Sequence, residues 1–496
     1  MSLSRRQLFA LSGGIVSGVG LTACGLALTS RGGSTGALLT SRVPMPAPFA
    51  VELPRLTPLR PDREGRARVT VRRKGIEILP GYTTEIAGYD GTFPGPSIEA
   101  TKGESLTLTV RNELDVPIVN HLHGGVTRPE HDGYPTDLVR PWHSREYRYP
   151  LDQRAATLWY HDHAMDLTGP NVYAGMAGAF VLRDSAEDDL GLPDGERELT
   201  LVITDRSFGE DAELVYPVSE GVIEYRYHGG LLGDVMLVNG APWPRLDVDA
   251  ARYRLRILNA CNARRLELAL DGDDGRPGEI VQVGTDQGLL TRPHRRSTLT
   301  LAPAERADVV VDFSRHPVGS QVTLVNRLDE GAMGQVMRFD VARRAQDDSR
   351  VPERLSTIER IDPASVVTTR DFRLSLGTSQ SSSGHGSHTD AQGRSLAMWA
   401  INGRPYEPGV DIARPRLGTV ERWRFTTDVH HPVHAHLVHF QVEQDGAAAW
   451  KDTIDVGPTS RAEVLVPIEG YRGRYVLHCH NLEHEDRMMM ADFSVV

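Results

Sequence analysis

The chain has few cysteines, three among 496 residues. Cys24 falls in an N-terminal leader and Cys479 stands between two histidines, which leaves Cys261 without a disulfide partner. We expect Cys261, in the run RILNACNARR, to be a small buried hydrophobic residue on a strand. The cysteine count therefore favours a protein held together by a cofactor, outside the cytoplasm and without disulfides.

Basic charge and helical periodicity are also scarce. The 66 acidic residues outnumber the 55 lysines and arginines, and no basic stripe runs along any segment, so nucleic acid is not expected as a partner. In place of long helical patterns, short β-rich runs alternate with Gly, Pro, Asp and Asn turns, which predicts an all-β protein of β-sandwiches. These runs are 105–110, 199–203, 253–258, 297–301, 307–313, 322–325 and 474–477.

The length predicts roughly three domains, at about 150 residues each. The turn-rich stretches SAEDDLGLPDGE and RRAQDDSRVPER divide the chain into domains at 50–185, 196–342 and 352–496. LVNGAPWPRLDV in the second domain and AINGRPYEPG in the third resemble each other, since each has an Asn-Gly turn followed by Pro. This likeness indicates an internal repeat.

Residues 1–49 are predicted to be an export signal and a tether. The run SRRQLF is a twin-arginine pattern, and the stretch after it is weakly apolar, rich in glycine and too short for a transmembrane helix. The run LTAC also resembles a lipobox, in which Cys24 carries a lipid; the alternative is ordinary cleavage with loss of Cys24. We expect export by the twin-arginine machinery to the cell envelope or the outside, with a lipid anchor left open.

The run HCHNLEHEDRMMM near the C-terminus has the residues of a copper site. A thiolate, imidazoles and a thioether are the ligands of a His₂Cys copper centre with a weak axial Met. Because successive side chains of a strand point to opposite faces, Cys479 faces one way while His478 and His480 face the other. His431 lies at an odd separation from the pair His434 and His436, so it turns to the opposite face from them. The predicted mononuclear set is His431, Cys479, His484 and Met489.

Four copies of His-x-His predict a second, larger metal site. On a strand this spacing puts both imidazoles on one face, and four copies are a much stronger signal than one. Imidazole suits several metals, so it is the Cys and Met of the first site that select copper. By number, eight imidazoles can hold three copper ions. The pairs are His121 and His123, His161 and His163, His434 and His436, and His478 and His480.

These segments resemble, in the same order, the four copper-binding motifs of the multicopper oxidases, and most closely the bacterial three-domain branch with spore-coat laccases and bilirubin oxidases. The resemblance covers about 51–496 and implies three cupredoxin-like Greek-key β-sandwich or barrel domains. It also implies a trinuclear cluster shared by domains one and three, no ligands in domain two, and four copper ions. The implied ligands are His431, Cys479, His484 and axial Met489 for type 1, His121 and His434 for type 2, and His123, His161, His163, His436, His478 and His480 for type 3.

Two carboxylates are candidates for proton delivery to the cluster. Glu485 follows the ligand His484, and Asp132 lies nine residues after His123. In the resembling branch, acids at these positions are associated with proton delivery. The alternatives are that Asp132 only makes a turn before a glycine and that Glu485 only hydrogen-bonds a ligand.

The sequence predicts a laccase-like enzyme that oxidises phenols, aryl amines or tetrapyrroles one electron at a time and reduces dioxygen to water. An alternative is a metallo-oxidase acting on Cu(I), Fe(II) or Mn(II); a Met-rich insert that would favour Cu(I) is absent, since Met488 to Met490 are the axial run itself. A copper-holding electron carrier or coat protein is disfavoured, because a carrier needs only the mononuclear site. The Ser/Gly-rich stretch 378–394, with His385 and His388, has the composition of a flexible loop.

Overall fold

A computed structural model describes residues 30–31, 33–219, 222–273, 278–377 and 398–496. The twin-arginine run, Cys24, His385 and His388 lie outside these residues. Strands dominate the described chain, and none of its helices combines the length and apolar character needed to cross a membrane.

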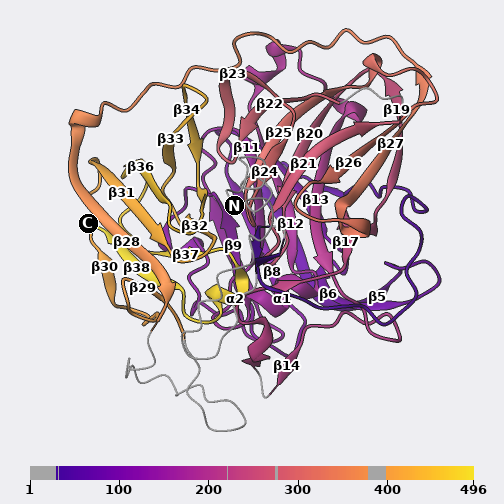
Figure 1. The fold of residues 1–496 in the computed structure, drawn as a ribbon. Coiled ribbons are helices and arrows are strands. Elements are labelled where there is room, and N and C mark those ends of the chain that lie inside the picture. The colour runs from indigo at the N-terminus through magenta and orange to yellow at the C-terminus, as the bar shows by residue number, and fades with distance from the viewer. Residues whose placement is uncertain (1–29, 32, 220–221, 274–277, 378–397) are drawn as a thin grey trace, which may run out of the picture.

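The large sheets form three pairs, each drawn from one continuous stretch of chain (Figure 1). The first pair contains strands of residues 58–183. One sheet has the order β10 (Ser144–Tyr149), β8 (Leu106–Asn112), β5 (Arg66–Ile76), β6 (Thr84–Tyr89); the other has β4 (Pro58–Leu59), β7 (Gly95–Thr101), β12 (Ala177–Arg183), β11 (Ala156–Asp162), β9 (Asn120–His123).

The second pair spans residues 198–344. Its larger sheet has the order β18 (Ala241–Pro242), β17 (Val235–Val238), β13 (Glu198–Arg206), β20 (Arg252–Asn259), β25 (Arg306–Asp312), β22 (Ile280–Thr285), β23 (Gly288–Arg296). Its smaller sheet has β19 (Arg245–Ala250), β27 (Gln335–Arg344), β26 (Gln321–Asn326), β21 (Leu266–Gly272), β24 (Leu299–Leu301).

The third pair spans residues 366–495. One sheet has the order β29 (Trp399–Ile401), β28 (Val366–Leu376), β31 (Val420–Thr427), β36 (Arg461–Pro467), β33 (Phe440–Gln444), β34 (Ala447–Lys451). The other has β30 (Asp411–Ala413), β38 (Met490–Val495), β37 (Gly473–Cys479), β32 (His431–Ala435), β35 (Thr453–Val456). Two short helices, α1 (Thr168–Ala174) and α2 (Leu482–Glu485), contact each other beside these sheets.

Alternating side chains explain why these runs form half-buried strands. In β8 the residues alternate between buried and partly exposed along the whole strand, as expected where one face packs on a core. Each sheet pair encloses its own large hydrophobic cluster. Every run that the sequence predicts as a strand overlaps one, and the all-β prediction is confirmed.

The two Asn-Gly turns have the same geometry. Asn239 and Asn402 have φ of 51° and 53°, and the glycines after them also have positive φ, as a type I′ turn requires at both central positions. The prediction for Cys261 is correct for burial and wrong for the strand: its side chain is 2% exposed, but β20 ends at Asn259 and Cys261 follows in the irregular segment before β21.

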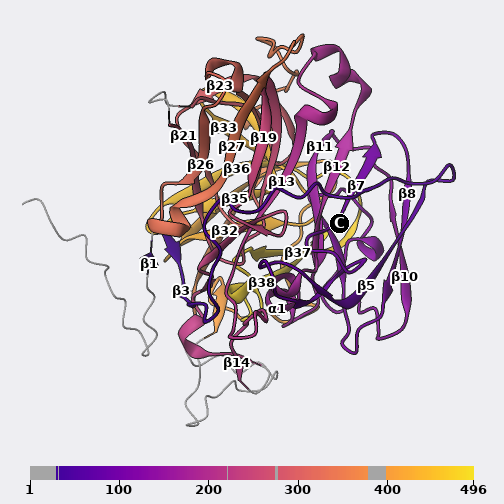
Figure 2. The same ribbon diagram turned by 90° about the vertical axis from the view of Figure 1, so that its right-hand side faces the viewer.

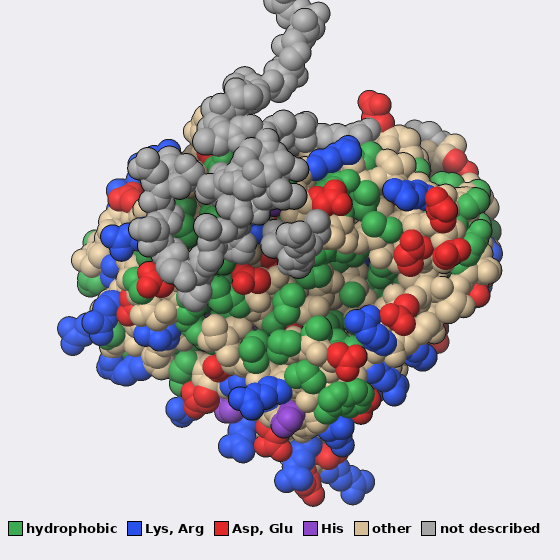
Figure 3. Space-filling model, turned by 90° about the horizontal axis from the view of Figure 1, so that it is seen from below, with side chains coloured by type: hydrophobic (Ala, Val, Ile, Leu, Met, Phe, Trp, Pro, Cys, Tyr) green, Lys and Arg blue, Asp and Glu red, His purple; other side chains and the backbone are tan. Residues whose placement is uncertain are grey.

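The third sheet pair lies on the left of Figure 1 and the second at its upper right, while Figure 2 shows β5, β8 and β10 of the first pair to the right of the second. The first and third sheet pairs meet at four strands, which are β9 and β11 of the first pair and β32 and β37 of the third. Basic and acidic side chains are mixed over the face seen from below, with hydrophobic side chains between them (Figure 3).

The predicted tether makes contacts with the body of the protein from Gly33 onward. Strand β3 (Ala37–Leu38) pairs in parallel with β16 (Leu231–Leu232). Farther along, Phe49 N donates to Trp243 O at 2.8 Å. This part of the N-terminal region therefore lies along the second sheet pair.

Candidate metal centre

A thiol and two imidazoles converge at one end of the third sheet pair. His431 begins β32, Cys479 ends β37 and His484 lies in α2. The Nδ1 atoms of His431 and His484 are 3.3 and 3.6 Å from the Cys479 Sγ and 3.0 Å from each other. All three side chains are fully buried. The three ligand atoms thus surround one point, as the predicted mononuclear site requires.

The outer ring nitrogens of this group are held by the protein. His431 Nε2 donates to Asp428 Oδ1 at 3.0 Å and His484 Nε2 donates to Gly229 O at 3.1 Å, which leaves both Nδ1 atoms facing the thiol. The ring of Trp399 packs against the ring of His484, tilted by 36° with centroids 3.9 Å apart. These contacts fix the orientation of both rings.

Met489 is brought to the same place by the backbone. Cys479 N donates to Met489 O at 3.1 Å, Met489 N donates to His484 O at 2.9 Å, and the Met489 side chain is fully buried in the core cluster that contains Cys479. The backbone therefore brings Met489 next to Cys479 and His484, in the same part of the buried core.

The eight predicted cluster histidines also come together. Strand pairing places His121 opposite His161 in the first sheet pair and His434 opposite His478 in the third. The rings of His121 and His436 stack with centroids 3.8 Å apart, and those of His123 and His434 are 3.6 Å apart, so the two sheet pairs share one cluster. His163, His436 and His478 form one compact triad of ring nitrogens. His480 completes the set, with its ring 4.9 Å from that of His123.

The unpaired ring nitrogens test whether this cluster fits metal ions. Buried polar atoms are nearly always hydrogen-bonded, so an orphan needs an explanation. In the described part of the chain, seven buried ring nitrogens of the cluster lack a partner: Nε2 of His121, His161 and His434, Nδ1 of His123 and His163, and both nitrogens of His480. Burial lowers the pKa of His161 to about 3 and that of His163 to about 4, which keeps these rings neutral. Neutral imidazoles with orphaned nitrogens on a common centre are what metal ligation requires.

Backbone and carboxylate oxygens orient the other ring nitrogens. Asp132 accepts from His436 Nδ1 through Oδ2 at 2.6 Å and from His121 Nδ1 through its backbone oxygen at 2.5 Å. Asp132 caps a short turn at Pro129–His131, so it does make a turn, but its buried side chain also holds one cluster imidazole. Burial raises the pKa of Asp132 well above its usual value, against a hydrogen bond from Thr127.

Glu485 reaches the cluster from α2. Its Oε2 is 3.0 Å from His478 Nδ1 and its Oε1 is 3.6 Å from His163 Nε2, with the side chain buried. Burial acts to raise the pKa of Glu485, but the imidazoles of His478 and His163 lower it to about 2. A carboxylate thus contacts two cluster rings directly, although it follows a ligand of the other site in sequence.

Sequence reasoning missed Asp452, which together with Thr453 lies within hydrogen-bond distance of His123 Nε2. Asp452 Oδ1 accepts from His123 Nε2 at 3.1 Å, and its carboxylate also receives two hydrogen bonds from Arg306. Asp428, Gly229 and Trp399 were missed for the same reason: they belong to no motif and reach the site only through the fold. The stretch 198–344, which forms the second sheet pair, supplies Gly229 and Arg306 to the surroundings of the two sites, and none of the ligand groups found among the described residues includes one of its side chains.

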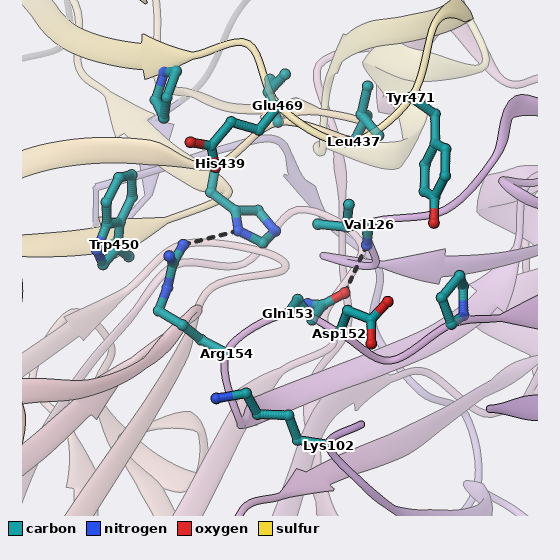
Figure 4. A pocket seen from close by; sticks show the side chains of 14 residues that line it. Lys102, Val126, Asp152, Gln153, Arg154, Leu437, His439, Trp450, Glu469 and Tyr471 are labelled. Atoms are coloured by element: carbon teal, nitrogen blue, oxygen red, sulfur yellow. Dashed lines mark hydrogen bonds between the residues drawn. The ribbon is translucent and has the colours of Figure 1, made fainter. Parts of the chain in front are cut away.

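Of the remaining histidines, His439 lies next to the cluster, in the wall of a cavity of about 420 Å³ between the first and third sheet pairs (Figure 4). Arg154 Nη2 donates to His439 Nδ1 at 3.1 Å, and the guanidinium lies 4.1 Å from the centre of the Trp450 ring. His439 Nε2 donates to Gly124 O at 3.1 Å. Because Leu437, also in the wall, follows His436, the cavity ends one residue from a cluster imidazole.

A buried thiol with two imidazoles and a thioether, beside eight imidazoles held between β-sandwiches, defines the class of copper-dependent oxidoreductases that use oxygen. A multicopper oxidase model matches residues 70–187 and a second one matches residues 380–496. The chain is 33% identical to a laccase of Bacillus subtilis, over 83% of this chain and 90% of that protein, and 33% identical to a bilirubin oxidase of Albifimbria verrucaria, over 91% and 80%. On these findings the chain belongs to the multicopper oxidase family.

Solved structures agree. A laccase of Pediococcus acidilactici matches with a TM-score of 0.79 and 28% identity, over 92% of this chain and 95% of that one. A metallo-oxidase of Campylobacter jejuni matches with a TM-score of 0.77 and 25% identity, over 90% and 96%. The family resemblance and the three cupredoxin-like domains expected from the sequence are confirmed, while the domain boundaries given above stay predictions.

Proposed function

We propose that this protein couples the one-electron oxidation of phenols, aryl amines or tetrapyrroles to the four-electron reduction of dioxygen to water, with four copper ions. The observation that carries the proposal is the shared strand β37, whose Cys479 enters the mononuclear group while the adjacent His478 enters the cluster. Copper, when bound, supplies the one-electron redox steps. The peptide between the two side chains is a short covalent path between the sites.

The orphaned nitrogens and the neighbours of each imidazole support the ligand assignment. The mononuclear type 1 site takes His431, Cys479 and His484, with Met489 axial. Burial raises the pKa of the Cys479 thiol, so only a bound cation keeps it as the thiolate. The cluster ligands are His121 and His434 for type 2, and His123, His161, His163, His436, His478 and His480 for type 3.

The two carboxylates have different proposed roles. Glu485, ionised at neutral pH and in contact with His478 and His163, is suited to accept a proton from solvent and pass it to the cluster. Asp132 holds the Nδ1 proton of His436 and so orients that ring. Glu485→Gln is then expected to slow dioxygen reduction while leaving oxidation of the donor by the type 1 site unchanged, as measured by stopped-flow reduction and reoxidation.

The electron donor reaches the protein on the side of His431. Asp428 accepts the hydrogen bond from His431 Nε2, and its side chain is 23% exposed, so it connects the buried ring to the surface. A small organic donor can transfer its electron at such a partly exposed edge of the site, without a deep binding pocket. The absence of a Met-rich insert in the sequence disfavours Cu(I). Rates with a substituted phenol, bilirubin, Cu(I) and Mn(II), measured side by side, distinguish a laccase-like enzyme from a metallo-oxidase.

The class of the enzyme is tested by copper content and by one substitution. The purified protein is expected to hold about four copper ions per chain, to be intensely blue and to consume oxygen with an organic donor. Cys479→Ser is expected to remove the blue band and the oxidase activity but not the fold. A blue, active Cys479→Ser variant, or a copper content of about one ion, contradicts the proposal.

The leader is proposed to direct export by the twin-arginine machinery, to the cell envelope or the outside. The support is the run SRRQLF followed by a short, weakly apolar stretch. The lipobox-like LTAC makes Cys24 the candidate for a lipid anchor. Mass spectrometry of the mature N-terminus decides between lipidated Cys24 and cleavage beyond it, and Arg5→Lys with Arg6→Lys is expected to block export.

A further inference from the structure

The segment from His228 to Leu232 supports the type 1 site along one of its edges. His228 O accepts from Trp399 Nε1 at 3.0 Å, and Trp399 packs against the His484 ring. Gly229 O accepts from His484 Nε2 at 3.1 Å. Leu231 N donates to Glu483 Oε2 at 3.0 Å. Three successive contacts of this short segment thus lie on His484 or its immediate neighbours.

The other edge of the same segment is covered by the N-terminal residues. Ala37 N donates to Gly230 O at 2.9 Å and Leu39 N donates to Leu232 O at 2.8 Å, in the parallel pairing of β3 with β16. These two strands form a two-stranded sheet, so β3 is the only strand partner of β16 among the described residues. The backbone that holds His484 is therefore fixed from behind by residues that precede the first sheet pair.

The close approach of the two strands depends on glycine. A Cβ atom at Gly36, whose φ is 153°, would lie 2.6 Å from Gly230 O. In the reverse direction, a Cβ atom at Gly230 would lie 2.4 Å from Thr35 O. Both clashes are with backbone atoms, which cannot rotate away, so any larger residue at position 36 pushes the two strands apart.

The N-terminal segment is also connected to the strand that carries the other imidazole. Arg265 N donates to the buried Ser34 Oγ at 2.9 Å, and Arg265 Nη1 donates to Gly33 O at 3.0 Å. The same guanidinium donates through Nε to Asp455 Oδ2 at 2.8 Å. Asp455 lies on β35, opposite the residue that follows His431 in β32. Contacts from the segment thus lead to both histidines of the mononuclear group.

We propose that residues Gly33–Leu39 are a positioning element of the type 1 site, which sets the orientation of the His484 ring through Gly229 and thereby the properties of the bound copper. A hydrogen bond to the outer nitrogen of a ligand imidazole fixes its orientation and basicity, and loss of such a partner changes the metal site without removing a ligand. The inference rests on the proposed assignment of His484 as a type 1 ligand. None of the residues 33–39 is a ligand of either site.

The experiment compares Gly36→Val with Gly319→Val. The control has the same kind of strained backbone, with φ of 96° at Gly319, but has nothing within 4 Å of the added Cβ, and it lies before β26, in the second sheet pair. Gly36→Ala serves as a milder variant if Gly36→Val does not fold. The readouts are the type 1 absorption and paramagnetic resonance spectra, the type 1 potential, the copper content, and hydrogen exchange of the Ala37 and Leu39 amides, which donate across the two strands, in the metal-free protein.

In Gly36→Val we expect a shifted type 1 potential and altered type 1 spectra, near wild-type copper content, and exchange at the Ala37 and Leu39 amides faster by about an order of magnitude or more. Gly319→Val is expected to match the wild type in all of these. Faster exchange at Ala37 and Leu39 with unchanged type 1 spectra and potential overturns the inference, because the strand pairing is then lost without effect on the site. A wild-type protein without a type 1 signal instead overturns the proposed function, and the two failures are distinct.

Discussion

Arg306 is the side chain whose loss is expected to cost most stability without touching a ligand. It is fully buried, and its five N–H groups all have partners. Two bond Asp452, at 2.7 and 2.5 Å, and the others reach the backbone oxygens of Thr157, Ala304 and Asp286. These partners come from all three sheet pairs or the turns beside them.

Arg306→Met leaves Asp452 as a buried carboxylate without its counterion. Removing one partner of a buried ion pair costs about 3–5 kcal/mol, because the remaining charge stays desolvated. The Arg306 guanidinium, against the effect of burial, holds the pKa of Asp452 well below its usual range, so this carboxylate is ionised at neutral pH. We therefore expect Arg306→Met to lower the free energy of unfolding by about 3–5 kcal/mol, and to weaken copper retention through His123.

The assay is urea unfolding of the metal-free protein, so that copper binding adds nothing to the measured stability. A double-mutant cycle with Asp452→Asn is expected to give a coupling energy of about 2 kcal/mol or more. The control is Arg73→Met, which breaks the exposed pair of Arg73 with Glu85 at 3.1 Å and is expected to cost about 1 kcal/mol or less. An Arg306→Met variant no less stable than Arg73→Met, or additive effects in the cycle, would refute the reasoning.

Other expected outcomes follow from single side chains. Met489→Leu should raise the type 1 potential and keep activity, since an axial thioether tunes the metal without holding it; an unchanged potential removes Met489 from the site. Against the effect of burial, Arg256 and Arg183 lower the pKa of Glu198 to about 2. The ion pairs therefore contribute their full stability above the usual glutamate pKa, and this contribution is lost as the pH falls toward 2. Glu198→Gln should therefore lower the urea midpoint at pH 7 but not near pH 2, and an equal loss at both would contradict this. Val126→Trp narrows the cavity of Figure 4; because this cavity ends beside the cluster, we expect the KM for dioxygen to rise while the donor KM is unchanged.

The candidate ligands were predictable because they follow the period of a strand. His478, Cys479 and His480 alternate in face, and the structure sends the first to the cluster and the second to the mononuclear group. The odd separation of His431 from His434 predicted their different sites by the same rule, and the structure agrees. Local geometry alone decides these outcomes, so the sequence is sufficient for them.

The partners that orient the ligands were not predictable in the same way. Asp452 approaches His123 from 329 residues away in sequence, and Gly229 approaches His484 from 255 residues away. One is a common acidic residue and the other contributes only a backbone oxygen, so neither leaves a pattern in the chain. The contacts of residues 33–39 were hidden for another reason: a composition rich in Gly and Ser is typical of tethers, whereas Gly36 is needed here for close packing.

The cluster imidazoles come from both ends of the chain, and His163 and His478, whose Nε2 atoms are 3.3 Å apart, are separated by 315 residues. When the ribosome has made only the first sheet pair, half of the cluster imidazoles have been synthesised. The other half are completed only with β37, almost the last strand. Copper can therefore bind at the complete cluster only after synthesis has ended and the two distant sheets have docked.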